Sequence, residues 1–184
     1  VPELAAKSMP CGTQIVTTEV LDEATARSLI PGEQCVEDCN YKLDYFRVTS
    51  DHRLLYGGGV TYGGGDPASI ERFVRSHLEK TFPQLTGVKF DYAWGGDFLL
   101  TMSRLPQFGR LNDSIYYAQG YSGHGVTTTH LAGKLLAEAI QGHAERFDAF
   151  AGLKHFPFPG GRMLRTPYTA LGAIYYGLRD KLGI

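Results

Sequence analysis

Alternating polar and apolar positions dominate the first half of the chain and predict strands. Residues Thr13 to Leu21 are rich in Val, Ile and Thr, which fit a pleated sheet. The run from Tyr41 to Thr49 alternates in character, and period two places Tyr45 and Arg47 on the same face of a strand. Residues 50–53 then have the composition of a hairpin turn. Together these runs predict an antiparallel sheet.

Helical spacing interrupts these strands twice. A short helical turn is expected from Asp22 to Leu29, before the break at Pro31-Gly32. A longer helix is expected over residues 67–82, with Asp66 as its N-cap and Pro67 in its first turn. The apolar residues of that helix form one buried stripe: Ile70, Phe73, Val74 and Leu78.

The second half of the chain has a mixed pattern. Val88 to Met102 is β-like, and a shorter β-like run covers Ile115 to Ala118. Helices are expected over Thr127 to Ile140 and over Thr166 to Leu182. The core-facing side of the first of these helices is predicted to consist of Leu131, Leu135, Leu136 and Ile140. The predicted fold class is therefore α+β or α/β.

A glycine-rich turn joins the shorter strand to the helix that follows it. The turn has the sequence Gly-Tyr-Ser-Gly-His-Gly-Val over residues 120–126. Gly123 and Gly125 carry no side chain to hold a ligand away, and the helix directs unpaired N–H groups and its positive dipole end at the same place. An electron-rich group is expected to bind there. An ordinary strand-to-helix connection is the alternative for such a turn taken alone.

Composition narrows the class of protein. The 184 residues are 43% hydrophobic and 20% charged, as is usual for a globular protein of one or two lobes. The net charge of −1 gives no electrostatic reason to bind nucleic acid or an anionic membrane. No apolar run approaches the roughly 20 residues that span a bilayer. The first residues also lack the segments of a signal peptide, so a cytoplasmic location is expected.

The sequence contains no known metal or nucleotide motif. Cysteines at positions 11, 35 and 39 have neither zinc nor redox spacing and are expected to be free thiols. The six histidines are scattered without H-E-x-x-H spacing, so no metal is predicted. The glycine triplets at 57–59 and 63–65 do not complete G-x-G-x-x-G, and no P-loop lysine follows them.

A longer pattern links both halves of the chain. Trp94-x-Gly96, Thr101, Pro106 and Gly109 precede the strand, the glycine turn and the helix. This order resembles the C-terminal part of the D-amino acid oxidase and sarcosine oxidase superfamily of FAD enzymes. Five further stretches are similar to an amine-oxidising branch of that superfamily: MPCGTQ (9–14), VEDCNY (36–41), LLYGGG (54–59), SGHGV (122–126) and FPGG (158–161).

The resemblance implies an FAD-dependent oxidoreductase that oxidises a C–N bond of a small-molecule amine. In that superfamily the ADP half of the flavin lies on an N-terminal Rossmann unit with a G-x-G-x-x-G turn, which nothing in this sequence matches. The chain is therefore expected to be the C-terminal portion of such an enzyme, inactive and without flavin when isolated. By the same analogy, residues 1–95 would be an antiparallel substrate-binding domain with helix 67–82. Residues 96–184 would be the C-terminal part of the Rossmann-like FAD-binding domain with the closing helix.

The resemblance also implies how the flavin is held. Members with covalent flavin use a Cys close to the Gly96 position, and this chain has none there, so FAD is expected to bind noncovalently. His124 is the one candidate for a catalytic base, and the alternative is a side chain that fills space beside the flavin. For Trp94 the alternative is a plain core tryptophan. The residues implied in cofactor binding are Trp94, Gly96, Thr101, Pro106, Ser122, Gly123, His124, Gly125, Val126 and Thr127.

Substrate recognition has two candidates on one strand face. The guanidinium of Arg47 suits a bidentate pair with a substrate carboxylate, and Tyr45 would line the same cavity. A structural arginine and a buried scaffold tyrosine are the alternatives. Two rival functions stay open: a related oxidase of another amine or amino acid, such as sarcosine, glycine or proline, and a ligand-binding module without redox chemistry.

Overall fold

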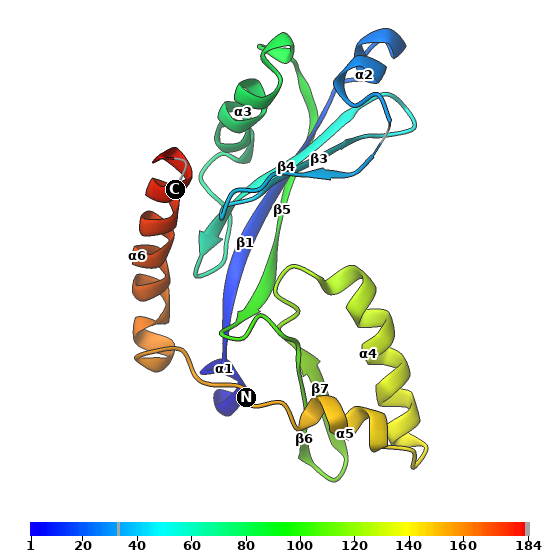
Figure 1. Ribbon diagram of the computed structural model, residues 1–184, viewed down its shortest axis with the longest axis vertical. Coiled ribbons are helices and arrows are strands. Elements are labelled where there is room, and N and C mark those ends of the chain that lie inside the picture. Colours follow the sequence, from blue (N-terminus) through cyan, green and yellow to red (C-terminus); the bar gives the residue numbers. More distant parts are fainter. Residues whose placement is uncertain (33, 183–184) are drawn as a thin grey trace. The chain divides into compact units, whose positions relative to one another are not determined.

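Two long strands each belong partly to two compact units of the chain. In the computed structural model, which describes residues 1–32 and 34–182, these strands are β1 (Ser8–Thr18) and β5 (Phe90–Thr101). Gly12–Asp97, with the chain from Thr169 onward, forms one unit, called here the sheet unit. Val1–Cys11 and Phe98–Tyr168 form the other, called the turn unit. Figure 1 labels the elements of both.

The sheet unit is built on a five-stranded sheet with the order β2-β3-β4-β1-β5. The short strand β2 (Val36–Glu37) pairs antiparallel with β3 (Asp44–Val48), and β3 pairs antiparallel with β4 (Leu54–Tyr62). The predicted hairpin turn is confirmed, because the Thr49 N–H donates to the Arg53 carbonyl oxygen at 2.9 Å. The predicted antiparallel sheet is therefore present.

Two helices cover the core of the sheet unit. The helix α2 (Glu23–Leu29) begins at Asp22, whose carboxylate accepts the Thr25 N–H at 2.9 Å. The helix α3 (Ile70–Thr81) lies beside the sheet (Figure 1) and buries Val74 and Leu78. A 3₁₀ turn, η1 (Pro83–Leu85), follows it. Their buried partners in the core are Val16, Ala26, Ile30, Val48, Leu54, Tyr56, Phe82 and Leu85.

The predicted start of α3 is wrong. Ser69, not Asp66, is the N-cap, and its hydroxyl accepts the Arg72 N–H at 3.3 Å. The Asp66 carboxylate instead accepts a hydrogen bond from the buried Gln14 amide at 3.5 Å. The carboxylate that the local sequence pattern predicts as the N-cap of α3 is therefore hydrogen-bonded to a residue distant in the sequence instead.

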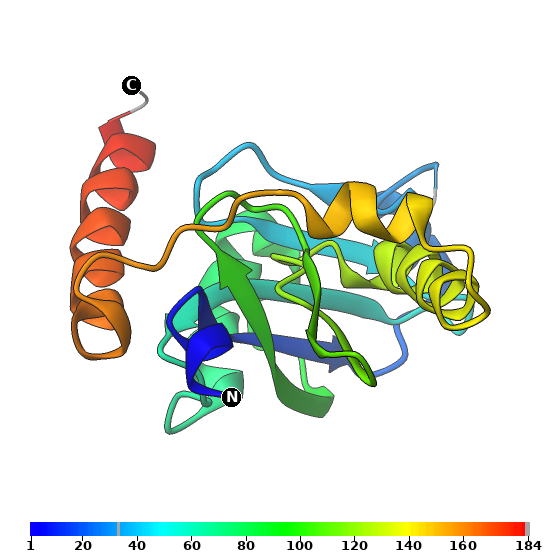
Figure 2. The same cartoon turned by 90° about the horizontal axis from the view of Figure 1, so that it is seen from below.

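The turn unit combines a hairpin with two helices. The strands β6 (Gln107–Asn112) and β7 (Ile115–Gln119) pair antiparallel. The helices α4 (Gly125–Ile140) and α5 (Glu145–Ala151) lie side by side in both views (Figures 1 and 2). A short helix, α1 (Pro2–Ala5), precedes β1 in the chain. The core of the unit consists of Phe108, Ala132, Leu135, Ala139 and Phe147.

The predicted core side of α4 is only partly correct. Leu135 is fully buried and Leu136 packs against the core, but Leu131 and Ile140 are exposed. Ala132 and Ala139 are buried in their place, because small side chains let α4 approach β6 and α5 closely. The strand β6 and the helix α5 were not among the expected elements. For β6 the reason is that Pro106 and Gly109 are residues typical of a loop.

The closing helix is longer than expected. The helix α6 spans Gly161–Leu182 and contains Pro167, whereas the sequence pattern starts it at Thr166. In the sheet unit, the ring of Tyr176 stacks on Tyr41 with centroids 4.1 Å apart, and the Asp180 carboxylate accepts the Tyr41 N–H at 3.2 Å. The apolar residues on its other side are exposed: Leu171, Ile174, Tyr175, Leu178 and Leu182.

The described residues contain neither a helix able to cross a membrane nor a cluster of metal ligands. Within residues 1–32 and 34–182, no helix has the length and apolar content needed to cross a membrane. The same residues contain no group of three or more His, Cys, Asp or Glu side chains placed to hold a metal ion.

A partly buried polar network connects the hairpin of the sheet unit to α3. The Asp44 carboxylate, with its side chain 13% exposed, accepts the Tyr56 hydroxyl at 2.9 Å and lies 3.0 Å from Nδ1 of His77. The Tyr56 hydroxyl also lies 2.9 Å from Oγ1 of Thr81. The hydrogen bond that His77 donates to the Asp44 carboxylate raises the pKa of His77 above its usual value, although burial acts in the opposite direction.

We predict that the stability supplied by His77 depends on pH. Because the folded pKa lies above the unfolded value of about 6.5, the contribution is fully present below pH 6.5 and is lost as pH rises through the folded pKa. The change His77→Gln should lower the free energy of unfolding by about 1 kcal/mol at pH 5.5 and by less at pH 8.5. Urea denaturation at both values measures this. The exposed His143→Gln is the control, and an equal loss for His77→Gln at the two pH values would contradict the prediction.

Candidate functional site

The glycine-rich turn of the turn unit connects β7 to α4 and has an unusual backbone. Gly120, Ser122 and Gly123 have φ angles of +71°, +55° and +95°. Glycine adopts such angles readily, whereas serine does not. The strand, turn and helix predicted here are confirmed, and α4 begins at Gly125, two residues before the expected start.

Ser122 fastens the turn to the end of β5. Its N–H donates to the Leu99 carbonyl oxygen at 3.0 Å, and its hydroxyl accepts the Thr101 N–H at 3.3 Å. The same hydroxyl donates to the Gly120 carbonyl oxygen at 3.2 Å. Ser122 is 8% exposed, so these contacts are shielded from water. The Ser122 side chain therefore points into the fold.

The next residues of the turn are open. A Cβ atom on Gly123 would have no neighbouring atom within 4 Å, and the side chain of Val126 is almost fully exposed. No side chain caps the start of α4, whose N-cap is His124. The first N–H groups of a helix have no acceptor inside the helix, and the positive end of the dipole is at the same place. This end of α4 can therefore take an electron-rich ligand group.

Thr101 is the last residue of β5, and Pro106 lies in the loop that follows it. The Thr101 hydroxyl donates to the Leu105 carbonyl oxygen at 2.8 Å, and the residue is buried. Thr101 also explains Gly120, because a Cβ atom there would lie 2.5 Å from the Thr101 methyl group. The contact between Thr101 and Gly120 thus requires a glycine at the start of the turn. The role of Gly120 was missed, although a glycine directly after a predicted strand is the signal that could have found it.

His124 and Thr127 lie at the start of α4, and both are exposed. The His124 N–H donates to the Tyr121 carbonyl oxygen at 3.0 Å, and its carbonyl oxygen accepts the Thr128 hydroxyl. Both contacts use the His124 backbone, so it is the main chain of this residue that shapes the turn.

Trp94 and Gly96 lie on β5 within the sheet unit. Trp94 is 43% exposed, so the described residues cover it only in part. A Cβ atom on Gly96 would meet no other atom within 4 Å. The Asp66 carboxylate lies against Gly95 between them, so this stretch of β5 is open at Trp94 and Gly96 but covered at Gly95.

Tyr45 lies across the sheet. Its ring covers Gly57 of the neighbouring strand, where any Cβ atom would collide with it, and its hydroxyl lies 3.0 Å from Oγ1 of Thr13 on β1. The ring thus spans β4 and reaches β1. A larger residue at position 57 would displace Tyr45.

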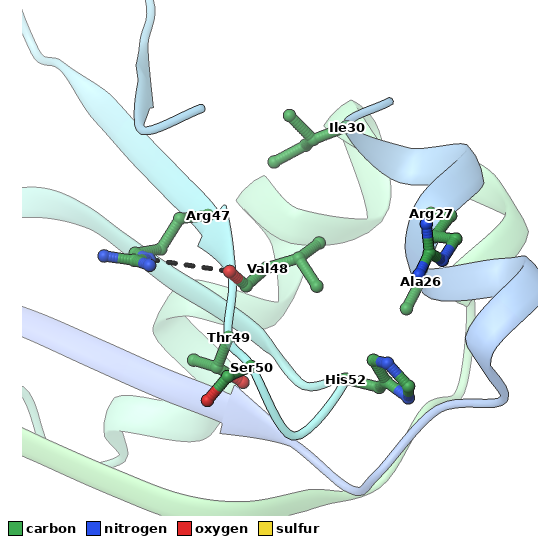
Figure 3. A pocket seen from close by; sticks show the side chains of 8 residues that line it. All are labelled: Ala26, Arg27, Ile30, Arg47, Val48, Thr49, Ser50 and His52. Atoms are coloured by element: carbon green, nitrogen blue, oxygen red, sulfur yellow. Dashed lines mark hydrogen bonds between the residues drawn. The ribbon is translucent and has the colours of Figure 1, made fainter. Parts of the chain in front are cut away.

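Arg47 stands at the rim of a small hollow. The hollow has a volume of about 120 Å³ and lies between α2, the end of β3 and the turn that follows it (Figure 3). In Figure 3 the guanidinium of Arg47 points away from Ile30 and His52, and its Nε lies 3.5 Å from the Val48 carbonyl oxygen. Among the ion pairs of the described residues, none involves Arg47. The lining residues are Ala26, Arg27, Ile30, Arg47, Val48, Thr49, Ser50 and His52.

The predicted site residues fall into three groups. Thr101, Pro106 and residues 122–127 belong to the turn unit, where contacts between the loop and the turn bring them together. Tyr45 and Arg47 lie on β3 of the sheet unit, and Trp94 and Gly96 lie on β5. In the sheet, β4 and β1 stand between these two strands.

Comparison with known proteins gives the chain a family. Residues 1–139 match the DAO family, described as FAD dependent oxidoreductase. The chain is 69% identical over 183 residues to gamma-glutamylputrescine oxidoreductase of Escherichia coli (strain K12), covering 100% of this chain and 43% of that protein. It is 41% identical to the probable oxidoreductase OrdL of Haemophilus influenzae, covering 95% of this chain and 40% of that protein.

Solved structures support the fold. The structure of glycine oxidase from Geobacillus kaustophilus is similar with a TM-score of 0.64 and 20% identity, over 82% of this chain and 40% of that one. At this identity the likeness concerns the fold alone. The chain spans less than half the length of the curated relatives that it matches.

We predict that Gly120 and Gly123 respond differently to the same substitution. Gly120→Ala adds a collision with the Thr101 methyl group to the backbone strain and should lower the free energy of unfolding by about 3 kcal/mol. Gly123→Ala adds strain alone and should lower it by about 1 kcal/mol. Urea denaturation followed by tryptophan fluorescence and far-UV circular dichroism measures both. Equal losses would show that the contact with Thr101 does not shape the turn.

Proposed function

Since the chain belongs to the DAO family of FAD-dependent oxidoreductases, we propose that it forms the C-terminal portion of an enzyme that oxidises gamma-glutamylputrescine. The reaction oxidises the free primary amine to an imine, which water hydrolyses to the aldehyde and ammonia, and hydrogen peroxide forms when oxygen is the acceptor. The observation that carries this proposal is the 69% identity to the Escherichia coli oxidoreductase along the whole chain.

The proposal includes a second part of the enzyme. The chain corresponds to 43% of the Escherichia coli protein, and its sequence contains no G-x-G-x-x-G turn for a dinucleotide. We therefore infer that a Rossmann unit of the same enzyme supplies the contacts to the adenosine and pyrophosphate. On this account the isolated chain is inactive. It supplies the flavin-facing turn and the substrate-binding sheet.

The residues of the turn fit a flavin ring. The open face at Gly123 and the uncapped start of α4 leave room and backbone donors for the N1 and O2 edge of an isoalloxazine. When bound, the flavin supplies the redox chemistry by accepting a hydride equivalent from the carbon that bears the amine. The backbone at Gly123, Gly125 and Val126 and the dipole of α4 would favour negative charge on a flavin held here. The dipole would stabilise that charge by about 1 kcal/mol, which would tune the potential without supplying the rate.

Binding of the flavin is noncovalent in this proposal. The cysteines of the chain stand at positions 11, 35 and 39, far in sequence from Gly96. Trp94 is exposed within its unit and is available to pack against the ring. His124 fills space at the turn, since an amine that has lost its ammonium proton needs no protein base.

Substrate specificity is assigned to the face of β3. The glutamyl end of the substrate carries a carboxylate and an amine, so it needs polar anchoring. Arg47 is suited to the carboxylate, because its guanidinium is exposed and no carboxylate of the described residues pairs with it. Tyr45 supports the same face through its contact with Thr13. A related oxidase of sarcosine, glycine or proline is the alternative within the family.

The test is steady-state kinetics of the full-length enzyme and of Arg47→Ala on gamma-glutamylputrescine and putrescine. The full-length enzyme should prefer gamma-glutamylputrescine over putrescine, sarcosine, glycine and proline. Losing one partner of a desolvated charge pair costs about 3 to 5 kcal/mol, so Arg47→Ala should lower kcat/KM for gamma-glutamylputrescine at least about a hundredfold if the bound substrate and the rest of the enzyme bury the pair. The loss for putrescine, which has no carboxylate, should be much smaller. Arg27→Ala, on the opposite rim of the hollow, is the matched control.

Two outcomes separate the parts of this proposal. An equal loss on both amines would remove Arg47 from the substrate site and leave the flavin assignment intact. Preference for sarcosine, glycine or proline would replace the substrate, and a full-length protein without a flavin spectrum would remove the redox function.

A further inference from the structure

We propose that Ser122 is a positioning residue that holds the flavin-facing turn in its binding shape before any flavin arrives. The inference rests on the proposed function, because it concerns the same turn. It assigns to Ser122 a role that differs from direct contact with the cofactor. Its side chain acts through the backbone that follows it.

The backbone of Ser122 is strained where a glycine would be relaxed. Its φ of +55° lies in the left-handed region, which costs roughly 1–2 kcal/mol for a residue with a Cβ atom. Glycine occupies both Gly120 and Gly123 in the same turn, with φ values of +71° and +95°. Serine differs from glycine only by its hydroxymethyl group. The contribution that offsets the strain at position 122 must therefore come from this group.

That hydroxyl bridges two segments. It accepts the Thr101 N–H at 3.3 Å and donates to the Gly120 carbonyl oxygen at 3.2 Å. Thr101 is 2% exposed, so removing the hydroxyl would take an acceptor away from a buried N–H. The loss of an acceptor at a buried donor destabilises the fold by an amount comparable to the strain or larger. The hydroxyl therefore offsets the strained backbone and fixes the turn on β5.

The fixed turn determines where the next N–H groups point. Gly123 follows directly, and α4 begins two residues later at Gly125. A preorganised set of donors binds developing negative charge more strongly than a mobile set, because no reorganisation is needed. Reduced flavin carries more negative charge than oxidised flavin. Loosening the turn should therefore weaken binding of the reduced form more than of the oxidised form, and the midpoint potential should fall.

The test compares Ser122→Ala and Ser122→Gly in the full-length flavoprotein, with Ser114→Ala as control. Ser114 is an exposed serine of the β6–β7 turn in the same unit. Both Ser122 variants should raise the Kd for FAD at least tenfold. They should also lower the midpoint potential by about 30 mV, which corresponds to a tenfold difference between the two flavin forms for a two-electron couple. Ser114→Ala should change neither quantity.

Ser122→Gly separates the hydroxyl from the strain. If it binds FAD as tightly as the unchanged protein and keeps its potential, the hydroxyl has no positioning role and the proposal is overturned. A Kd that rises while the potential stays constant would also overturn it, since simple loss of stability weakens both flavin forms alike.

Amide hydrogen exchange gives a readout that needs no flavin. In the 184-residue chain, the amide of Thr101 should exchange slowly and should exchange at least tenfold faster in Ser122→Ala, with no change in Ser114→Ala. Unchanged protection in Ser122→Ala would overturn the proposal. If the full-length protein held no flavin, the proposed function would fail, while exchange at Thr101 would still decide whether the hydroxyl fixes the turn.

Discussion

The docking of the glycine turn onto the end of β5 is the contact on which the candidate site depends. Two hydrogen bonds of Ser122, to Leu99 and Thr101, and the close approach of Gly120 to Thr101 bring the turn against this strand. The same contact leaves Gly123 open and α4 without a side-chain cap. The docking of the turn on β5 thus buries the polar atoms of Ser122 and also leaves the backbone of the next residues exposed. A ligand that accepts hydrogen bonds finds donors already in place.

The sheet unit shows the same use of close contacts between backbone and side chain. Tyr45 lies over Gly57 and reaches Thr13, so one aromatic ring crosses three strands. On the other side of β3, Asp44 connects the hairpin to His77 of α3. These two contacts fix the face that carries Arg47. The substrate role of this face belongs to the proposed function, because the chain covers less than half of the relatives that it matches.

Local patterns were sufficient for elements whose signals lie within a few residues. Asp22 caps α2 through its own side chain, and the turn at residues 50–53 closes a hairpin between neighbouring strands. The strand, turn and helix around Gly123 followed from glycine chemistry and helix periodicity. The sequence also placed Tyr45 and Arg47 on one strand, which the structure confirms.

Contacts between distant residues explain the rest. Asp66 is taken by Gln14, 52 positions away, so Ser69 caps α3 instead. Leu131 and Ile140 have the spacing of a core stripe, yet Ala132 and Ala139 are the residues that face β6 and α5. Gly120 is explained only by Thr101, and the inward direction of Ser122 only by β5. Such pairings depend on packing that periodicity within one element does not encode.

The central claim is that this chain carries the ring-facing part of a flavin site whose ADP-binding part lies elsewhere in the enzyme. Titration of FAD, followed by quenching of its fluorescence, tests this directly when the 184-residue chain and the full-length protein are compared. The account predicts tight binding by the full-length protein and little quenching by the chain alone. Micromolar or tighter binding by the isolated chain, or no binding by the full-length protein, would contradict it.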